Sequence, residues 1–400
     1  MNEMTFLKNL DFIRTGGSKE ELKAAEFIQT ELQKLGLKAK IEDFPVHAST
    51  ISKAELEVTK PYKKSIPCTG YMNSVSAELT KDMYYLRNKN DERDLQNIKD
   101  KIVFLDGGLP YWTYKSLIEN GAAGFITCNG NLHDDDTDID CKEIREPLEK
   151  LGQLPGVNIH LKDGYPMIQN NAQTVKLTLK QTPVKDAKSR NVVCKIKGED
   201  DEIIVFSAHY DSVPEGPGAY DNMSGAAIIM ELCRYFHAHR PRRTMEFIWF
   251  GAEEKGLLGS QNYIKIHENE LSAHRFNMNV DLAGQLVGGT VAGVTGDASV
   301  CSILTYMAHE IGIGMSTKNQ IWGSDSNAFA WKGIPAMTLN RDGFGMHTRH
   351  DTIALLSDWS LERSAVLLGY IADRLGNIEG FPFERKVPEE FIAQLNEYFG

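Results

Sequence analysis

Four short apolar runs in the second half of the chain alternate with helical patterns, and this alternation constrains the fold more than any other feature. The runs span residues 202–208, 244–252, 276–280 and 335–341. Between the first two runs, residues 224–236 repeat apolar side chains with the 3.6-residue period of a helix. Strands that alternate with helices predict an α/β sheet covered by helices.

The predicted domain organisation follows from a change in the pattern of helix and strand signals along the chain. Ser18 and Glu21 have the spacing of a capping box, and Gly36 is a stop signal, so we expect a helix over residues 18–35. Residues 51–185 contain short strand signals, polar turns and a small β-α-β pattern. We therefore predict one domain from residues 1–50 and 186–400, interrupted by a separate α/β module. The acidic run at residues 133–140 is interpreted as a solvated loop.

Composition excludes several classes of function. The chain has 44 basic and 55 acidic residues, a net charge of −11, so we expect no nucleic-acid partner. No stretch approaches the roughly 20 apolar residues of a membrane span, and the amino terminus lacks the apolar core of a signal peptide. The six cysteines form no C-x-x-C pair, which indicates free thiols. We accordingly predict a cytoplasmic protein without membrane contact.

Acidic and imidazole side chains follow the carboxyl ends of the predicted strands. In chain order they are His209 and Asp211, Asp221 on the turn before the next helix, Glu253 and Glu254, Asp281, and His347. Open α/β sheets bind ligands in the crevice at this edge, so residues distant in sequence are expected to converge there. Taken singly, each has an ordinary structural explanation: Asp211 as a turn former and Asp221 as a helix cap, for example.

The mixture of imidazole nitrogen and carboxylate oxygen suits zinc, and less selectively cobalt or manganese. Five of these residues are candidate ligands: His209, Asp221, Glu254, Asp281 and His347. Two metals with three protein ligands each need six ligand positions, and five residues fill them only if one carboxylate bridges. We favour Asp221 as the bridge. Asp211 is interpreted as a residue that orients His209 through its other ring nitrogen.

Taken in order, these segments resemble the motifs of the co-catalytic zinc exopeptidases, typified by bacterial leucyl aminopeptidases, aminopeptidase Y and glutamate carboxypeptidase. The matching stretches are SAHYDS, YDNMSGAA, FGAEEKGLLGS, NVDLAG, GSDSNAF with KGIPAM, and MHTRHDT. The resemblance covers most of the chain. It implies the zinc exopeptidase fold, a mixed and mostly parallel sheet covered by helices. Residues 51–185 resemble a protease-associated domain, which some members carry at this position.

The resemblance also implies roles for individual residues. The same five candidate ligands fall on the positions that hold two zinc ions per chain, and Glu253 falls on the general base. The peptide bond after the bridging aspartate, here Asp221–Asn222, is often cis in such enzymes. The implied activity is removal of amino-terminal residues from peptide substrates through a metal-bound hydroxide.

The sequence departs from the family pattern at one position and leaves alternatives open. Many members have a tyrosine before the final ligand histidine, where its hydroxyl helps to hold the oxyanion, but this chain has Met346. A thioether cannot donate a hydrogen bond, so another donor must serve. A carboxypeptidase or dipeptidase of the same family and a non-catalytic, receptor-like relative are the alternatives. The oligomeric state is not predicted.

Overall fold

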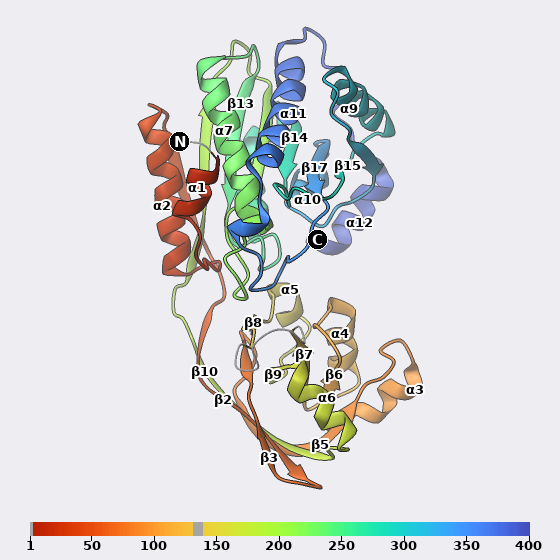
Figure 1. Cartoon of the computed structure of the whole chain (residues 1–400). Coiled ribbons are helices and arrows are strands. Elements are labelled where there is room, and N and C mark those ends of the chain that lie inside the picture. The colour runs from red at the N-terminus through yellow and green to blue at the C-terminus, as the bar shows by residue number, and fades with distance from the viewer. Residues whose placement is uncertain (1–2, 131–138) are drawn as a thin grey trace. The chain divides into compact units, whose positions relative to one another are not determined.

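A computed structural model describes residues 3–130 and 139–400. The chain divides into two compact units (Figure 1). The first unit comprises Met1–Val46 and Lys188–Gly400, and the second comprises His47–Ala187. Residues 133–138 of the acidic run lie outside the described ranges, so the loop predicted there stays a prediction.

An eight-stranded mixed sheet forms the centre of the first unit, in the order β1-β11-β13-β12-β14-β17-β15-β16. The strands are β1 (Ala39–Pro45), β11 (Lys188–Ile196), β12 (Ile203–His209), β13 (Thr244–Phe250), β14 (His274–Val280), β15 (Thr290–Thr295), β16 (Ser316–Asn319) and β17 (Ala336–Arg341). The four neighbours β13, β12, β14 and β17 are parallel to one another. Their carboxyl ends therefore meet at one edge.

The central strands are apolar throughout because both faces of the sheet are buried. Along β12, Ile204 and Phe206 face one apolar cluster, whereas Ile203 and Val205 face another. The larger cluster includes side chains of α1, α2, α7, α9 and α11, and the smaller one includes those of α8, α10 and α12. On the face of the sheet that carries the larger cluster, α7 (Ser224–Ala238) and α11 (Asp358–Asn377) lie side by side (Figure 1). This burial fixes the register of the strands that end at the site.

Eight α-helices of the first unit are described. They are α1 (Glu3–Asn9), α2 (Lys19–Lys34), α7 (Ser224–Ala238), α8 (Leu258–Ile266), α9 (Ala298–Glu310), α10 (Ser326–Trp331), α11 (Asp358–Asn377) and α12 (Glu389–Phe399). As the capping box predicts, the Ser18 side chain accepts a hydrogen bond from the backbone N–H of Glu21 at the start of α2. The predicted helix at residues 224–236 corresponds to α7, and the four predicted strands correspond to β12, β13, β14 and β17.

The second unit contains a nine-stranded sheet in the order β3-β2-β10-β5-β6-β7-β9-β4-β8. Its strands are β2 (Ser49–Lys60), β3 (Lys64–Ile66), β4 (Thr69–Met72), β5 (Ala77–Tyr85), β6 (Ile102–Leu105), β7 (Gly124–Asn129), β8 (Lys142–Glu143), β9 (Gly156–His160) and β10 (Thr174–Pro183). Its described helices include α3 (Glu92–Leu95), α4 (Tyr111–Glu119), α5 (Glu146–Glu149) and α6 (Leu161–Gln169). The β6-α4-β7 segment, with β6 and β7 parallel, is the predicted β-α-β pattern.

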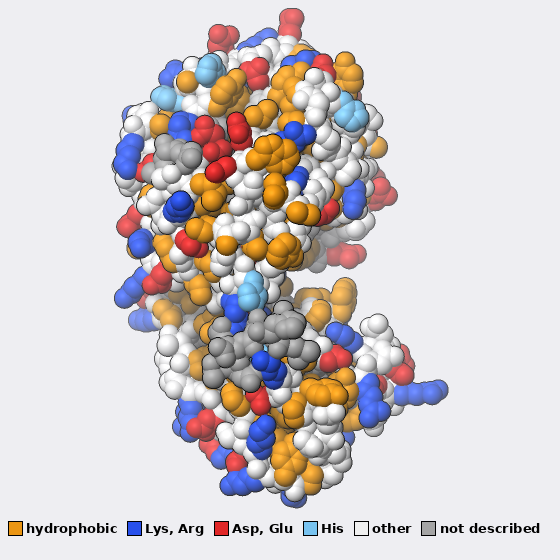
Figure 2. Space-filling view, viewed as in Figure 1, with side chains coloured by type: hydrophobic (Ala, Val, Ile, Leu, Met, Phe, Trp, Pro, Cys, Tyr) orange, Lys and Arg blue, Asp and Glu red, His pale blue; other side chains and the backbone are white. Residues whose placement is uncertain are grey.

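The surface carries both signs of charge. On the face shown in Figure 2, lysine and arginine side chains are interspersed with acidic and apolar ones. None of the helices in the described part of the chain has an apolar stretch long enough to cross a lipid bilayer. All six cysteines are free, and Cys128, Cys194 and Cys233 are buried.

The first prediction concerns the core of the first unit. The ring of Phe206 stacks between Phe247 and Phe236, with centroid distances of 5.0 and 5.9 Å, and Phe206 is fully buried. Replacing Phe206 by Ala leaves a cavity and should lower the free energy of unfolding by about 3–5 kcal/mol in a denaturant titration. Tyr306→Ala, at a side chain that is 65% exposed, is the control and should change it by less than about 0.5 kcal/mol. Equal effects would contradict this account of the core.

Candidate metal centre

The parallel strands bring the predicted site residues together at one edge of the sheet. His209 is the last residue of β12, and Asp281 directly follows β14. Glu253 and Glu254 follow β13 after a short turn, and His347 lies on the segment after β17. Because neighbouring parallel strands end at the same level, these side chains converge.

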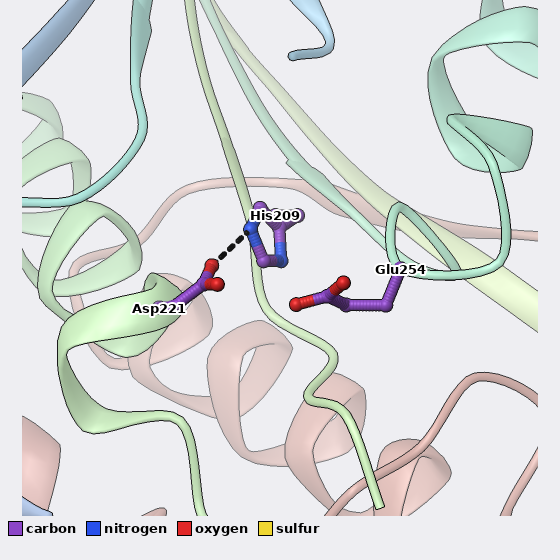
Figure 3. A group of neighbouring side chains, drawn as sticks. All are labelled: His209, Asp221 and Glu254. Carbon is purple, nitrogen blue, oxygen red and sulfur yellow. Dashed lines mark ion pairs between the residues drawn. The ribbon is translucent and has the colours of Figure 1, made fainter. Parts of the chain in front are cut away.

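His209 lies at the centre of the group and is 1% exposed. Its Nε2 atom is 3.0 Å from an Asp221 carboxylate oxygen, 3.4 Å from one of Asp281 and 4.0 Å from one of Glu253. Figure 3 shows His209, Asp221 and Glu254 turned toward one another, and one ligand atom of each lies within 4.8 Å of those of the other two. One imidazole thus faces carboxylates from three other segments of the chain.

Asp221 occupies the position between the two histidines. Its Oδ1 atom contacts His209 Nε2 at 3.0 Å, and its Oδ2 atom contacts His347 Nε2 at 2.9 Å. The same His347 nitrogen lies 3.1 Å from Glu254 Oε1. Asp281 thus lies close to His209, at 3.4 Å, and Glu254 lies close to His347. The five candidate ligands form two groups that share one carboxylate.

Asp211 holds the turn that carries the two glutamates. It is fully buried, and its carboxylate accepts hydrogen bonds from the backbone N–H groups of Glu253 at 3.0 Å and Glu254 at 3.2 Å. Asp211 Oδ1 also lies 3.5 Å from His209 Nδ1, beyond ordinary hydrogen-bond distance, and this ring nitrogen has no hydrogen-bond partner in the described part of the chain. The shorter contacts of Asp211 are with the backbone, a role for which the sequence carried no signal.

Several residues at the site adopt a left-handed backbone that non-glycine residues seldom use. The φ angles are +52° at Ala252, directly before Glu253, +73° at Leu282, directly after Asp281, and +57° at His347. Such conformations persist only where surrounding contacts impose them, and they cluster at functional sites. The Asp221–Asn222 peptide bond is cis, as the resemblance implied.

The electrostatics reflect acids crowded around two imidazoles. Burial raises the pKa of Glu253 well above its usual value, and Glu254 and Asp281 add to this effect. Burial alone would lower the pKa of His347, but the neighbouring Glu254 and Asp221 raise it to about 11. Burial would likewise raise the pKa of Asp221, yet hydrogen bonds from His209 and His347 hold it well below its usual range. A cation can replace the protons that these groups hold.

The donor set fits a divalent metal. Two imidazole nitrogens and the carboxylates of Asp221, Glu254 and Asp281 converge, which is the ligand chemistry of zinc. Carboxylates buried side by side are unfavourable unless a positive charge compensates them. The residues present could therefore hold a metal. The candidate ligands also form two sets, with Asp221 common to both.

Two residues of the GSDSNAF motif belong to the site although the sequence analysis gave them no role. The Ser324 hydroxyl donates a hydrogen bond to Asp281 Oδ2 and accepts one from Asn279 Nδ2 at 2.7 Å. Asp325 is fully buried, and neither of its carboxylate oxygens has a hydrogen-bond partner in the described part of the chain. Burial raises its pKa to about 7. The GSDSNAF motif was visible in the sequence, but only the fold shows which of its side chains lie near the cluster.

Residues 191–372 match the family model described as Peptidase family M28. This segment contains all seven predicted site residues. Over these residues, which make up less than half of the chain, the sequence is similar to that family. The fold and the convergence of the site residues agree with this similarity.

Two curated relatives of the chain are aminopeptidases by name. Aminopeptidase YwaD of Bacillus subtilis is 28% identical over 285 residues, covering 68% of this chain and 58% of the relative. Leucine aminopeptidase 2 of Trichophyton rubrum is 26% identical over 330 residues, covering 72% of this chain and 65% of the relative. The chain thus spans less than two thirds of the length of these relatives.

Solved structures show the same fold over nearly the whole chain. A zinc aminopeptidase from Bacillus subtilis superposes with a TM-score of 0.76 at 24% identity, covering 95% of this chain and 94% of that one. A Peptidase M28 precursor from Shewanella amazonensis superposes with a TM-score of 0.79 at 23% identity, covering 96% and 95%. The predicted fold class, a mixed α/β sheet of the zinc exopeptidase type, is confirmed.

The position of Asp221 generates the second prediction. Asp221→Ala should weaken zinc binding more than a change at any other candidate ligand, because it removes the one carboxylate that both groups share. Competition with a chromophoric chelator measures the affinity. Asp297→Ala removes an exposed helix-capping aspartate of the same unit and should leave zinc binding unchanged. Full zinc retention in Asp221→Ala would show that the bridge is misassigned.

Proposed function

We propose that this chain is a metal-dependent aminopeptidase that holds two zinc ions and removes amino-terminal residues from peptides. The observation that carries the proposal is the contact of the two Asp221 carboxylate oxygens with different histidines, at 3.0 and 2.9 Å. The match of residues 191–372 to the family model described as Peptidase family M28, and the aminopeptidase names of the relatives, support it.

In this proposal each residue has a distinct part. His209 and Asp281 hold one zinc ion, Glu254 and His347 hold the other, and Asp221 binds both. When bound, two zinc ions lower the pKa of water and polarise a substrate carbonyl. Asp211 fixes the backbone of the glutamate turn, so that the side chains of Glu253 and Glu254 keep their directions.

Glu253 is proposed as the general base. Its carboxylate lies at the edge of the cluster, 4.0 Å from His209 Nε2, with 12% of the side chain exposed. In this proposal the Glu253 carboxylate takes a proton from water and delivers it to the leaving amine. A base must lie within reach of the substrate, and Glu253 is more exposed than its neighbour Glu254.

Amino-end cleavage is favoured by the charges around the site. Acidic side chains accept hydrogen bonds from an ammonium group but repel a terminal carboxylate. Arg341 and Arg349, which flank His347 in the sequence, are the candidates for a clamp on such a carboxylate. The Arg341 guanidinium instead donates to the carbonyl oxygens of Gln285 and Leu286 and to the Thr290 hydroxyl, and the residue is 9% exposed. These contacts occupy Arg341 and remove one of the two candidates for a carboxylate clamp.

The remaining parts of the proposal rest on the sequence. We propose that residues 51–185 are a protease-associated module inserted in a peptidase domain of residues 1–50 and 186–400. The cytoplasmic location stays a prediction, as does the hydrogen-bond donor that replaces a hydroxyl at Met346, a side chain that is 45% exposed.

The third prediction separates the two glutamates. Glu253→Gln should keep zinc and the fold yet lower kcat by a factor of about 10²–10⁴, because an amide cannot accept the proton. Glu254→Gln should instead weaken zinc binding, because it removes a ligand oxygen. Steady-state kinetics and zinc competition on the same preparations measure both effects. Zinc loss in Glu253→Gln with zinc retention in Glu254→Gln would mean that the two roles are exchanged.

The fourth prediction tests the direction of cleavage. An unblocked tetrapeptide and its carboxyl-terminal amide should both be shortened from the amino end, and the N-acetyl form should stay intact. Mass spectrometry of the products, with Glu253→Gln as the inactive control, identifies the end that is removed. Cleavage of the acetylated peptide from its carboxyl end would favour the carboxypeptidase alternative, and no cleavage of any peptide by zinc-loaded protein would favour the non-catalytic one.

A further inference from the structure

We infer that Arg14 and Asp351 are positioning residues that together hold the backbone segment Pro217–Asp221, and with it the shared carboxylate. The inference rests on the proposed role of Asp221 as the ligand of both metals. Neither residue is among the candidate ligands, and they lie 337 positions apart in a chain of 400. Both are buried: Arg14 is 0% and Asp351 1% exposed.

Arg14 grips the carbonyl side of the segment. Its guanidinium donates hydrogen bonds to the carbonyl oxygens of Pro217 and Gly218, the latter at 3.1 Å. The same group donates to the carbonyl of Tyr210, the residue after His209. The Arg14 backbone N–H donates to the Ser212 hydroxyl at 3.0 Å. One planar cation thus ties both ends of the loop between His209 and Asp221.

Asp351 grips the amide side of the same segment. Its carboxylate accepts hydrogen bonds from the backbone N–H groups of Tyr220 at 2.6 Å and Asp221 at 3.0 Å. Its backbone carbonyl accepts a third from the N–H of Ala219 at 3.3 Å. Asp351 lies four residues after His347, so the same contacts tie the loop of the last candidate ligand to the backbone of Asp221.

The two charges compensate each other across the backbone between them. Arg14 has no ion pair with a carboxylate in the described part of the chain, and a buried cation is costly unless nearby charge offsets it. The negative charges of Asp211, Asp351 and Asp221 act on Arg14, and its charge acts on Asp351 in return. Charge-assisted hydrogen bonds to backbone groups are stronger than neutral ones. The segment is therefore held from both sides without a direct contact between the two charged groups.

Close packing of the segment supports this interpretation. Gly218 has φ of +58°, and a Cβ atom there would lie 2.2 Å from the carbonyl oxygen of Asp221. The chain turns so tightly that no side chain fits, and the turn presents its carbonyls to Arg14 and its amides to Asp351. The consequence is a fixed distance between His209 and the shared carboxylate, and between that carboxylate and His347.

The test compares Arg14→Met, Asp351→Asn and the double variant in the full-length protein. Zinc affinity is measured by chelator competition well below the melting temperature, with circular dichroism to verify the fold and steady-state kinetics on an unblocked peptide. Each single variant should weaken zinc binding roughly 10-fold to 100-fold, as loss of a residue behind a metal ligand does elsewhere. The kcat should fall more than KM rises. The zinc affinity of the double variant should be no lower than that of the weaker-binding single variant, because both changes release the same segment.

Arg243→Met is the matched control. Arg243 is also buried, at 2% exposed, and donates to the backbone carbonyls of Leu375, Ile378 and Glu379. It precedes β13, whereas the site lies beyond the other end of that strand. Its loss should lower the melting temperature and leave zinc affinity unchanged. If Arg14→Met fails to fold, Asp351→Asn, which preserves side-chain shape, decides alone.

Three outcomes would overturn the inference, and the first two separate it from the proposed function. In the first, folded Asp351→Asn keeps the zinc affinity and kcat of the wild type, while Asp221→Ala loses zinc. This result would overturn the positioning role alone. Zinc retention in Asp221→Ala would overturn both the shared ligand and the residues said to position it. The fold-decreases in zinc affinity of the two single variants could also multiply in the double variant. That result would show that the two residues act on separate elements, and it would contradict the inference.

Discussion

The contact of one carboxylate with two imidazoles is the interaction on which the site depends. Asp221 contacts both His209 and His347, with both distances at or below 3.0 Å; Asp281 lies near His209, and Glu254 lies near His347. A single aspartate can serve two groups of ligands only if its backbone is fixed. The buried Asp351 and the buried Arg14 both make hydrogen bonds to the backbone of this segment.

The sheet explains why such a crowd of acids can exist in a folded protein. Strands buried on both faces have a well-specified register, and this register fixes the positions of the residues that directly follow them. The cost of placing carboxylates together is offset by that large core and by hydrogen bonds to backbone amides, of which Asp211 is the clearest example. A bound cation would remove much of the remaining cost.

The sequence predicted those features that depend on local pattern. Apolar runs located the central strands, and acidic or imidazole residues after them located the cluster, because parallel strands place their carboxyl ends at one edge. Roles that depend on backbone contacts were not predictable in this way. Arg14 donates to carbonyl oxygens, and every residue has one, so nothing in the sequence identifies its partners. Ser324 and Asp325 stood in a motif that could be seen, but only the fold shows that they face Asp281 and the cluster.

The central claim is that two cations bind on either side of Asp221. Crystals of the zinc-loaded protein, with diffraction data recorded above and below the zinc absorption edge, test it most directly. The account predicts two anomalous peaks about 3.5–4 Å apart, one beside His209 and Asp281 and the other beside His347 and Glu254, each within bonding distance of one Asp221 oxygen. A single peak at full zinc saturation, or two peaks that Asp221 does not bridge, would contradict it.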